Sequence, residues 1–557
     1  MPTDMEIASK ATLQHVSKMA DQIGISEDQL ELYGKYKAKL PLSLIDQKKQ
    51  DDCNLILVSA ISPTPAGEGK TTTSIGLTQG LNRIGKQTTV VLREPSLGPV
   101  FGIKGGATGG GHSQVLPMED INLHFTGDFS AVEKDHNLLS ALIDNNLQNR
   151  KRSLDLDPRL IEWKRVMDMN DRALRNVTVG QGGTAGGVPR QTGFDITAAS
   201  EIMAILCLSN DLADLKRRLG NIFVGSSFKD RTPIYCRDLN AQGAMAALLK
   251  DAIKPNLVQT IEGNPAIIHG GPFANIAQGT NTVIATRMGM SLSDYVVTEA
   301  GFGADLGAQK FLDIKCVSAG LKPKAVALVA TVRALRYHGG ADLKEVNEPN
   351  AAAVEKGLEN LEKHVENIGK FGLKCVVAIN KFTNDTDEEI ALIKKRCESL
   401  GQSAVVANVW GEGGAGAEDL AHEIVKIVDE GKSDFKPVYD WDWPVRKKIK
   451  TIATEIYGAE NVEYSSDAKR ALRRIKKLGL EGLPICMAKT QKSLSDNPDL
   501  LGRPTGFDLT VREIEIAAGA GFIVPITGDM MRMPGLPTVP SAELIDIDDD
   551  GQISGLF

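Results

Sequence analysis

A glycine-rich run followed by Lys70 and Thr71 carries the strongest chemical signal in the sequence. The run stands between an apolar segment, Asn54–Ala60, and residues with a helical pattern. In this context backbone N–H groups wrap phosphates, the lysine reaches the terminal phosphates and the threonine hydroxyl binds Mg²⁺. Thr64 stands where the standard pattern has its first glycine. We predict a P-loop site that binds ATP with Mg²⁺, made of Thr64, Pro65, Ala66, Gly67, Glu68, Gly69, Lys70 and Thr71.

A second cationic cluster follows the next apolar run, Thr88–Leu92. Arg93 comes directly after this run, and five glycines crowd the segment Gly105–Gly111 a little further on. So many glycines prevent a regular helix or strand and favour a loop clamped on a ligand. Arg93 and Lys104 would supply fixed positive charge for a second small anion or a transferred phosphoryl group.

Two histidines and an aspartate are further candidates. His124 lies in a glycine-bordered region shortly before Asp128, and His269 ends an apolar run before Gly-Gly. A lone histidine is as readily structural as catalytic, but these positions predict His124 and His269 at a site. Asp128 is predicted to share the metal ion with Thr71.

The segment Glu299–Gly307 joins carboxylates to glycines directly after the apolar run Tyr295–Thr298. Its GxGxxxG pattern is not placed as a dinucleotide fingerprint is. Carboxylates beside glycines suit amine or hydroxyl donors, so we predict that Gly301 and Gly303 line a binding site.

Two aromatic residues follow the last apolar runs before a Pro- and Trp-containing stretch. Phe382 comes after Cys375–Asn380, and Trp410 comes after Ala404–Val409. If the two strands are neighbours, both rings emerge at one sheet edge and can sandwich a planar heterocycle. Two other interpretations stay open: the rings belong to the core, or Asn380-Lys381-Phe382 reads an adenine.

These candidates all follow β-branched apolar runs that alternate with helical segments. Near-continuous apolar strands of this kind indicate a parallel sheet covered on both faces, which binds ligands at the carboxyl ends of its strands. The predicted fold class is α/β, with a large P-loop-type, mainly parallel sheet domain covered by helices and smaller α/β domains. The predicted domains are residues 1–365, 366–435 and 436–557.

Composition narrows the class of protein. The chain has 557 residues, of which 42% are hydrophobic and 24% charged, and a net charge of −7. These values are typical of a globular protein, and no basic excess indicates a nucleic-acid partner. No signal segment or long apolar run indicates secretion or a membrane partner, and seven cysteines without CxxC spacing predict buried thiols in a cytoplasmic protein.

The glycine segment Gly102–His112, the segment Val329–Gly340 and the predicted P-loop together resemble the formate–tetrahydrofolate ligases, end to end. His112 stands where that family is expected to have tyrosine. The resemblance implies ATP-dependent joining of formate to tetrahydrofolate through formyl phosphate, with Arg93 on the formyl phosphate and Phe382 and Trp410 on the pteridine. It further implies that K⁺ or NH₄⁺ supports the activity and that the protein is a homotetramer. Only about 50 residues precede the first strand, which predicts the monofunctional form.

Proteins of other classes share a Gly-Lys-Thr-Thr-Thr loop. A dethiobiotin-synthetase-like ligase, an oxyanion-pump ATPase and a nucleotide-gated partitioning switch therefore stay open as alternatives. A switch should hydrolyse ATP without formate, whereas the ligase should make a hydroxamate from formate, folate and ATP when hydroxylamine traps the acyl group.

Overall fold

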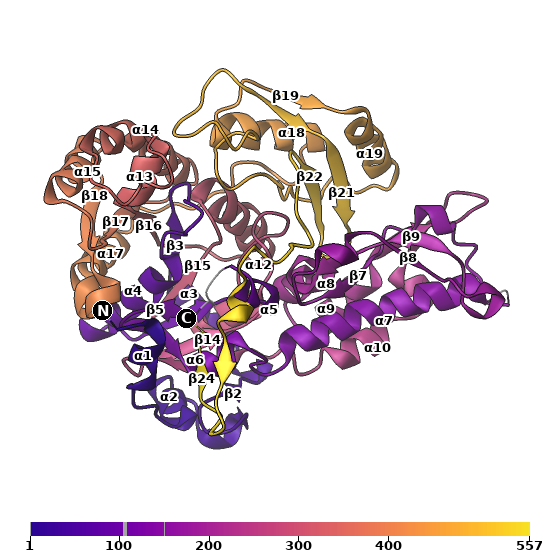
Figure 1. The fold of residues 1–557 in the computed structure, drawn as a ribbon, viewed down its shortest axis with the longest axis horizontal. Coiled ribbons are helices and arrows are strands. Elements are labelled where there is room, and N and C mark those ends of the chain that lie inside the picture. Colours follow the sequence, from indigo (N-terminus) through magenta and orange to yellow (C-terminus); the bar gives the residue numbers. More distant parts are fainter. Residues whose placement is uncertain (1, 104–107, 150, 557) are drawn as a thin grey trace.

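A long, mostly parallel sheet organises the chain in the computed structural model, which describes residues 2–103, 108–149 and 151–556 (Figure 1). The strands between β14 and β18 run parallel, whereas β13 pairs antiparallel with β14 and with β2. The order is β1 (Glu31–Leu32), β2 (Ala38–Lys39), β13 (Asn256–Thr260), β14 (Pro265–Ile268), β4 (Thr88–Leu92), β15 (Tyr295–Glu299), β3 (Asn54–Ala60), β16 (Ala325–Ala330), β17 (Cys375–Asn380) and β18 (Ser403–Ala407).

Helices cover both faces of this sheet because alternate residues of each strand point to opposite sides. Ile56 and Val58 of β3 share one apolar cluster with α4 (Lys70–Arg83) and α17 (Glu418–Glu430). Leu55 and Leu57 belong to the cluster on the other face, with α11 (Val283–Leu292), α14 (Ala351–Lys370) and α15 (Asp387–Ser399). The near-continuous apolar composition of the strands follows from this two-sided burial, and it confirms the predicted α/β class.

Four apolar runs of the sequence form the predicted strands, as β3, β4, β15 and β17. The run Ala404–Val409 differs, because the last sheet strand ends at Ala407 and Trp410 lies on the short helix α16 (Val409–Glu412). Outside the central sheet, β11 (Phe223–Ser226) pairs antiparallel with β12 (Pro233–Tyr235). Ile485 and Ala488 make isolated bridges, and residues 34–36 join the β1–β2 hairpin.

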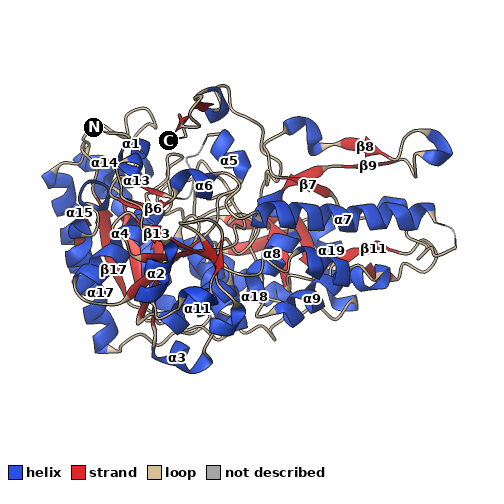
Figure 2. Ribbon diagram, turned by 90° about the horizontal axis from the view of Figure 1, so that it is seen from below, coloured by secondary structure: helices blue, strands red, loops and turns tan. Residues whose placement is uncertain are grey.

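An arm between β6 (Ser113–Leu116) and β13 projects from the body of the molecule, as Figures 1 and 2 both show. Its long helix α7 (Asp128–Gln148) lies along the arm, and the small hairpin of β8 (Val177–Val179) and β9 (Arg190–Thr192) lies towards its tip. This unit was not predicted from the sequence.

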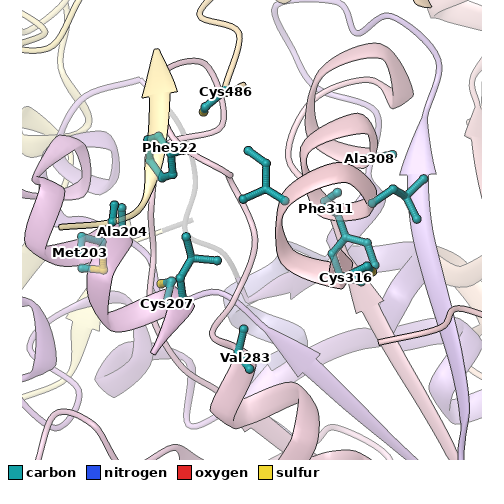
Figure 3. Close-up of a cluster of buried hydrophobic side chains, with 14 of the residues drawn as sticks. Met203, Ala204, Cys207, Val283, Ala308, Phe311, Cys316, Cys486 and Phe522 are labelled. Carbon is teal, nitrogen blue, oxygen red and sulfur yellow. The ribbon is translucent and has the colours of Figure 1, made fainter. Parts of the chain in front are cut away.

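The C-terminal segment packs onto the same core as the helices that follow the sheet strands. Phe522 at the start of β22 (Phe522–Ile526) and Cys486 lie with Ala204 and Phe311 in one buried apolar cluster (Figure 3). The predicted boundary between residues 365 and 366 falls within α14, between the paired strands β16 and β17 of the central sheet. All seven cysteines are buried free thiols, as predicted. None of the described helices is long and apolar enough to cross a membrane.

A buried ion pair joins the antiparallel edge of the sheet to the arm. The Lys39 ammonium on β2 donates to both carboxylate oxygens of Asp128, at 2.6 and 2.7 Å, and to the Lys254 carbonyl oxygen at 2.9 Å. The Asn256 amide donates to the same carboxylate at 2.9 Å. Asp128 begins α7, so this pair fixes where the long helix of the arm begins.

Replacing Asp128 should destabilise the fold strongly. Asp128→Asn leaves the buried Lys39 ammonium without its counter-charge, so the free energy of unfolding should fall by about 3–5 kcal/mol. Urea unfolding followed by intrinsic fluorescence measures the change. The control is Asp529→Asn, which breaks an exposed pair with Arg512 and should cost less than about 1 kcal/mol. Equal stability of the Asp128 variant and the wild type would contradict the structural role of the pair.

Candidate functional site

The segment Thr64–Thr71, here called the 64–71 loop, connects β3 to α4 at the carboxyl edge of the sheet. Gly67 and Gly69 have φ values of 81° and 69°, in the left-handed region that favours glycine. A Cβ on Gly69 would lie 2.4 Å from Nδ2 of Asn380 at the end of β17. The turn therefore needs glycine both for its conformation and for close packing, and it presents the N-terminus of α4 to the edge.

Glu68 holds the 64–71 loop closed. Its buried carboxylate accepts hydrogen bonds from the Thr64 backbone N–H at 2.6 Å, from the Thr64 hydroxyl at 2.9 Å and from the Thr331 hydroxyl. Burial raises the pKa of Glu68, and these hydrogen bonds act against the rise. Thr64 thus replaces the usual first glycine with a side chain that this carboxylate binds.

Thr71, Arg93 and Glu299 converge beside the 64–71 loop. The Thr71 hydroxyl donates to Glu299 Oε2 at 2.9 Å, and Arg93 Nη2 lies 3.5 Å from Glu299 Oε1. A Cβ on Gly301 would lie 3.1 Å from Arg93 Nη1, so the glycine leaves room for the guanidinium. Thr71, Arg93 and Gly301 come from three separate sequence motifs. The fold brings them together in one cluster.

Phe382 lies on the other side of the 64–71 loop. The residue is 37% exposed, and the Arg333 guanidinium carbon lies 4.9 Å from the ring centroid. Arg333 also donates to the Gly67 carbonyl oxygen at 2.6 Å, which ties the aromatic residue to the loop. This double contact places Arg333 beside the 64–71 loop.

Trp410 packs on the glycine hairpin of β5 (Gly109–Gly110) and β6. Cβ atoms on Gly110 and Gly111 would lie 3.3 and 2.7 Å from its ring atoms, so the indole rests on bare backbone. Its Nε1 donates to Asp4 Oδ1 at 3.0 Å. β17 and β18 are parallel neighbours, so Phe382 and Trp410 both follow the same sheet edge.

His269 and Asp128 do not join this cluster. His269 is fully buried, with Nδ1 at 2.7 Å from the Thr282 hydroxyl and Nε2 at 2.6 Å from the Ala252 carbonyl oxygen. Burial lowers its pKa to about 4. Both ring nitrogens are therefore engaged in the core, so no contact with this cluster supports the predicted catalytic role, which stays a prediction. Asp128 likewise binds Lys39, and the metal ion that it is predicted to share with Thr71 stays a prediction.

Other predicted residues lie where their roles stay predictions. His124 is exposed in the turn before α7. Gly303 packs near Ile61, which directly follows β3, and a Cβ there would lie 3.4 Å from the Ile61 carbonyl oxygen. Lys104 lies outside the described residues.

A buried polar network under the 64–71 loop was missed entirely. Ser62, two residues before the loop, contacts Nε2 of His338 through its carbonyl oxygen at 2.9 Å and Nε2 of His364 through its hydroxyl at 3.0 Å. Asn360 donates to the same hydroxyl at 3.1 Å. Burial lowers the pKa of both histidines to about 4, so they are neutral supports of the loop. Nothing in the spacing of these residues predicts their meeting.

The fold and site define a class: an α/β protein with a glycine-lined, polar site at the carboxyl edge of a mostly parallel sheet. The family model for formate–tetrahydrofolate ligase matches residues 2–557. The chain is 60% identical to a formate–tetrahydrofolate ligase of Methylococcus capsulatus and 58% identical to one of Methylibium petroleiphilum, with complete coverage of all chains.

The chain therefore belongs to the formate–tetrahydrofolate ligase family, and it is a ligase. The resemblance found from the glycine segments and the 64–71 loop is confirmed over the whole length.

Gly111→Ala should displace Trp410. The new Cβ would lie 2.1 Å from the Trp410 carbonyl oxygen, which accepts a 2.8 Å hydrogen bond from the His112 N–H. We expect a shifted Trp410 emission spectrum and, in urea unfolding, a loss of about 1–3 kcal/mol from overpacking in addition to the strain of a left-handed alanine.

The matched control is Gly431→Ala, since Gly431 has a similar φ of 61° and no atom within 4 Å of the position that a Cβ would take. The control carries only the backbone strain of a left-handed alanine, about 1–2 kcal/mol. Equal losses in the two variants would show that contact with Trp410 contributes nothing.

Proposed function

We propose that this ligase uses ATP to join formate to tetrahydrofolate, giving 10-formyltetrahydrofolate, ADP and phosphate through formyl phosphate. The convergence of Thr71, Arg93 and Glu299 beside the 64–71 loop is the observation that carries this proposal. This arrangement puts a phosphate-binding turn beside a cationic group that can hold a second anion. Phosphoryl transfer to a carboxylate requires these two parts to lie close together.

In the first step a formate oxygen attacks the γ-phosphorus, and the bond between that phosphorus and the β–γ bridging oxygen breaks. Lys70 neutralises the transferring phosphoryl group, and Arg93 holds the acyl phosphate that forms. Mg²⁺, held in part by the Thr71 hydroxyl, supplies further neutralising charge when bound. In the second step the folate N10 amine attacks the formyl carbon, phosphate leaves with the formate oxygen, and the nitrogen loses its proton.

Phe382 and Trp410 are proposed to flank the pteridine. Each ring is backed on one side, by the Arg333 guanidinium and by the backbone at Gly111, so each can offer its remaining surface to a planar ligand. The contact of Arg333 with Gly67 also brings Phe382 close to the 64–71 loop, which keeps adenine as the competing ligand for this ring.

Support of activity by K⁺ or NH₄⁺, a homotetrameric assembly and a cytoplasmic location complete the proposal. They rest on the likeness to the family.

Lys70→Ala tests the phosphoryl-transfer role. Loss of the fixed charge should lower turnover at least about a hundredfold, or about 2.7 kcal/mol of transition-state stabilisation. The assay is ADP release that depends on both formate and tetrahydrofolate. Lys394→Ala on the exposed face of α15 is the control and should keep its turnover. Near-normal turnover of a folded Lys70 variant would overturn the assignment, and wild-type ADP release without formate would favour a switch or an ATPase.

Phe382→Ala tests the position of the pteridine. Loss of the stack and of its buried area should raise the folate KM about tenfold and leave the ATP KM within about twofold. Initial-rate measurements at saturating co-substrates give both constants. Phe228→Ala on the arm, also an exposed phenylalanine, is the control. A raised ATP KM with an unchanged folate KM would place adenine, not pteridine, on this ring.

A further inference from the structure

Glu299 is the last residue of β15, and β15 pairs directly with β3, the strand that leads into the 64–71 loop. Glu299 lies opposite Val58 in that register and is 1% exposed. A buried carboxylate thus stands at the end of the strand next to the phosphate-binding turn. The prediction made from the sequence concerns the glycines of this segment. It gives the Glu299 carboxylate no role with a metal ion.

Both oxygens of this carboxylate face groups of the proposed reaction. Oε2 accepts from the Thr71 hydroxyl at 2.9 Å, and Oε1 lies 3.5 Å from Arg93 Nη2. A cation bound to the Thr71 oxygen would therefore have Glu299 as its nearest protein carboxylate in the described contacts, either directly or through one water.

Two other acids, Glu68 of the loop and Asp128 at the start of the arm, are already engaged by other groups. The Glu68 carboxylate binds the Thr64 N–H and the Thr64 and Thr331 hydroxyls, and Asp128 binds Lys39. The described residues contain no group of three or more His, Cys, Asp or Glu side chains able to hold a metal ion. Mg²⁺ does not need such a cage, because it is commonly held by one or two protein oxygens with phosphates and waters.

We propose that Glu299 is the carboxylate that, with Thr71, holds the divalent cation of the bound nucleotide. This proposal rests on the proposed nucleotide site. Strand pairing brings Glu299 to the hydroxyl of Thr71, and the same carboxylate aims Arg93 at the phosphoryl group. A bound cation would have the Thr71 hydroxyl oxygen and the Glu299 carboxylate as its protein ligands, and the carboxylate would supply the charge that attracts it.

Binding of ADP to Glu299→Gln, measured by calorimetry with Mg²⁺ and with EDTA, tests the proposal without catalysis. Glutamine keeps the shape and an acceptor for Thr71 but removes the charge that attracts the cation. The gain in ADP affinity on adding Mg²⁺ should be at least about fivefold smaller in the variant than in the wild type. Metal-free ADP affinity should stay equal or rise, because a negative charge near the phosphates is gone.

Weaker ADP binding by equal factors with and without Mg²⁺ would indicate a structural role only and would overturn the proposal. So would an unchanged gain, or a wild type without any gain. Failure of the wild type to bind ADP in either condition would instead remove the nucleotide site itself. Glu299→Asp, which keeps the charge, should retain part of the gain and serves if the glutamine variant does not fold. Glu262→Gln is the control, since this exposed carboxylate contacts Arg83 and Gly414.

Discussion

The site depends on one constraint: the parallel strands from β14 to β18 end at the same edge of a single sheet. Their order places β15 and β16 on either side of β3, although both come more than 200 residues later in the chain. Six of these strands, all except β14, then deliver a part of the site where they end. These parts are the 64–71 loop after β3, Arg93 after β4, Glu299 on β15, Thr331 after β16, Asn380 and Phe382 on and after β17, and Trp410 after β18.

Glycine lets these strand ends approach one another. The sequence holds 55 glycines, and several of them at the site leave space that a neighbouring side chain needs. Gly69 admits the Asn380 amide, Gly111 admits the Trp410 ring and Gly301 admits the Arg93 guanidinium. Close packing of backbone against polar and aromatic groups is thus the common reason for the glycine clusters, and the bound ligand is proposed to complete this packing.

The sequence predicted those parts of the fold and site that depend on local pattern. Strands β3, β4, β15, β16 and β17 are buried on both faces, so each appears as a continuous apolar run, and the residues after them are candidate site residues by a general rule. Contacts between segments that are distant in the sequence left no pattern in the sequence. Lys39 meeting Asp128, the two histidines meeting Ser62 and Arg333 meeting Gly67 depend on tertiary packing alone. The burial of His269 left no signal either, because a buried structural histidine and a catalytic one have the same local sequence pattern.

The central claim is that ATP phosphorylates formate at the carboxyl edge of the sheet before the folate amine attacks. The most direct measurement starts from [¹⁸O]formate, ATP and tetrahydrofolate. Mass spectrometry of the inorganic phosphate released during turnover then shows whether it contains ¹⁸O. Transfer of one ¹⁸O atom from formate to each phosphate released is the predicted result, because the formate oxygen that attacks phosphorus leaves with it. Phosphate free of ¹⁸O, with 10-formyltetrahydrofolate still formed, would contradict the account.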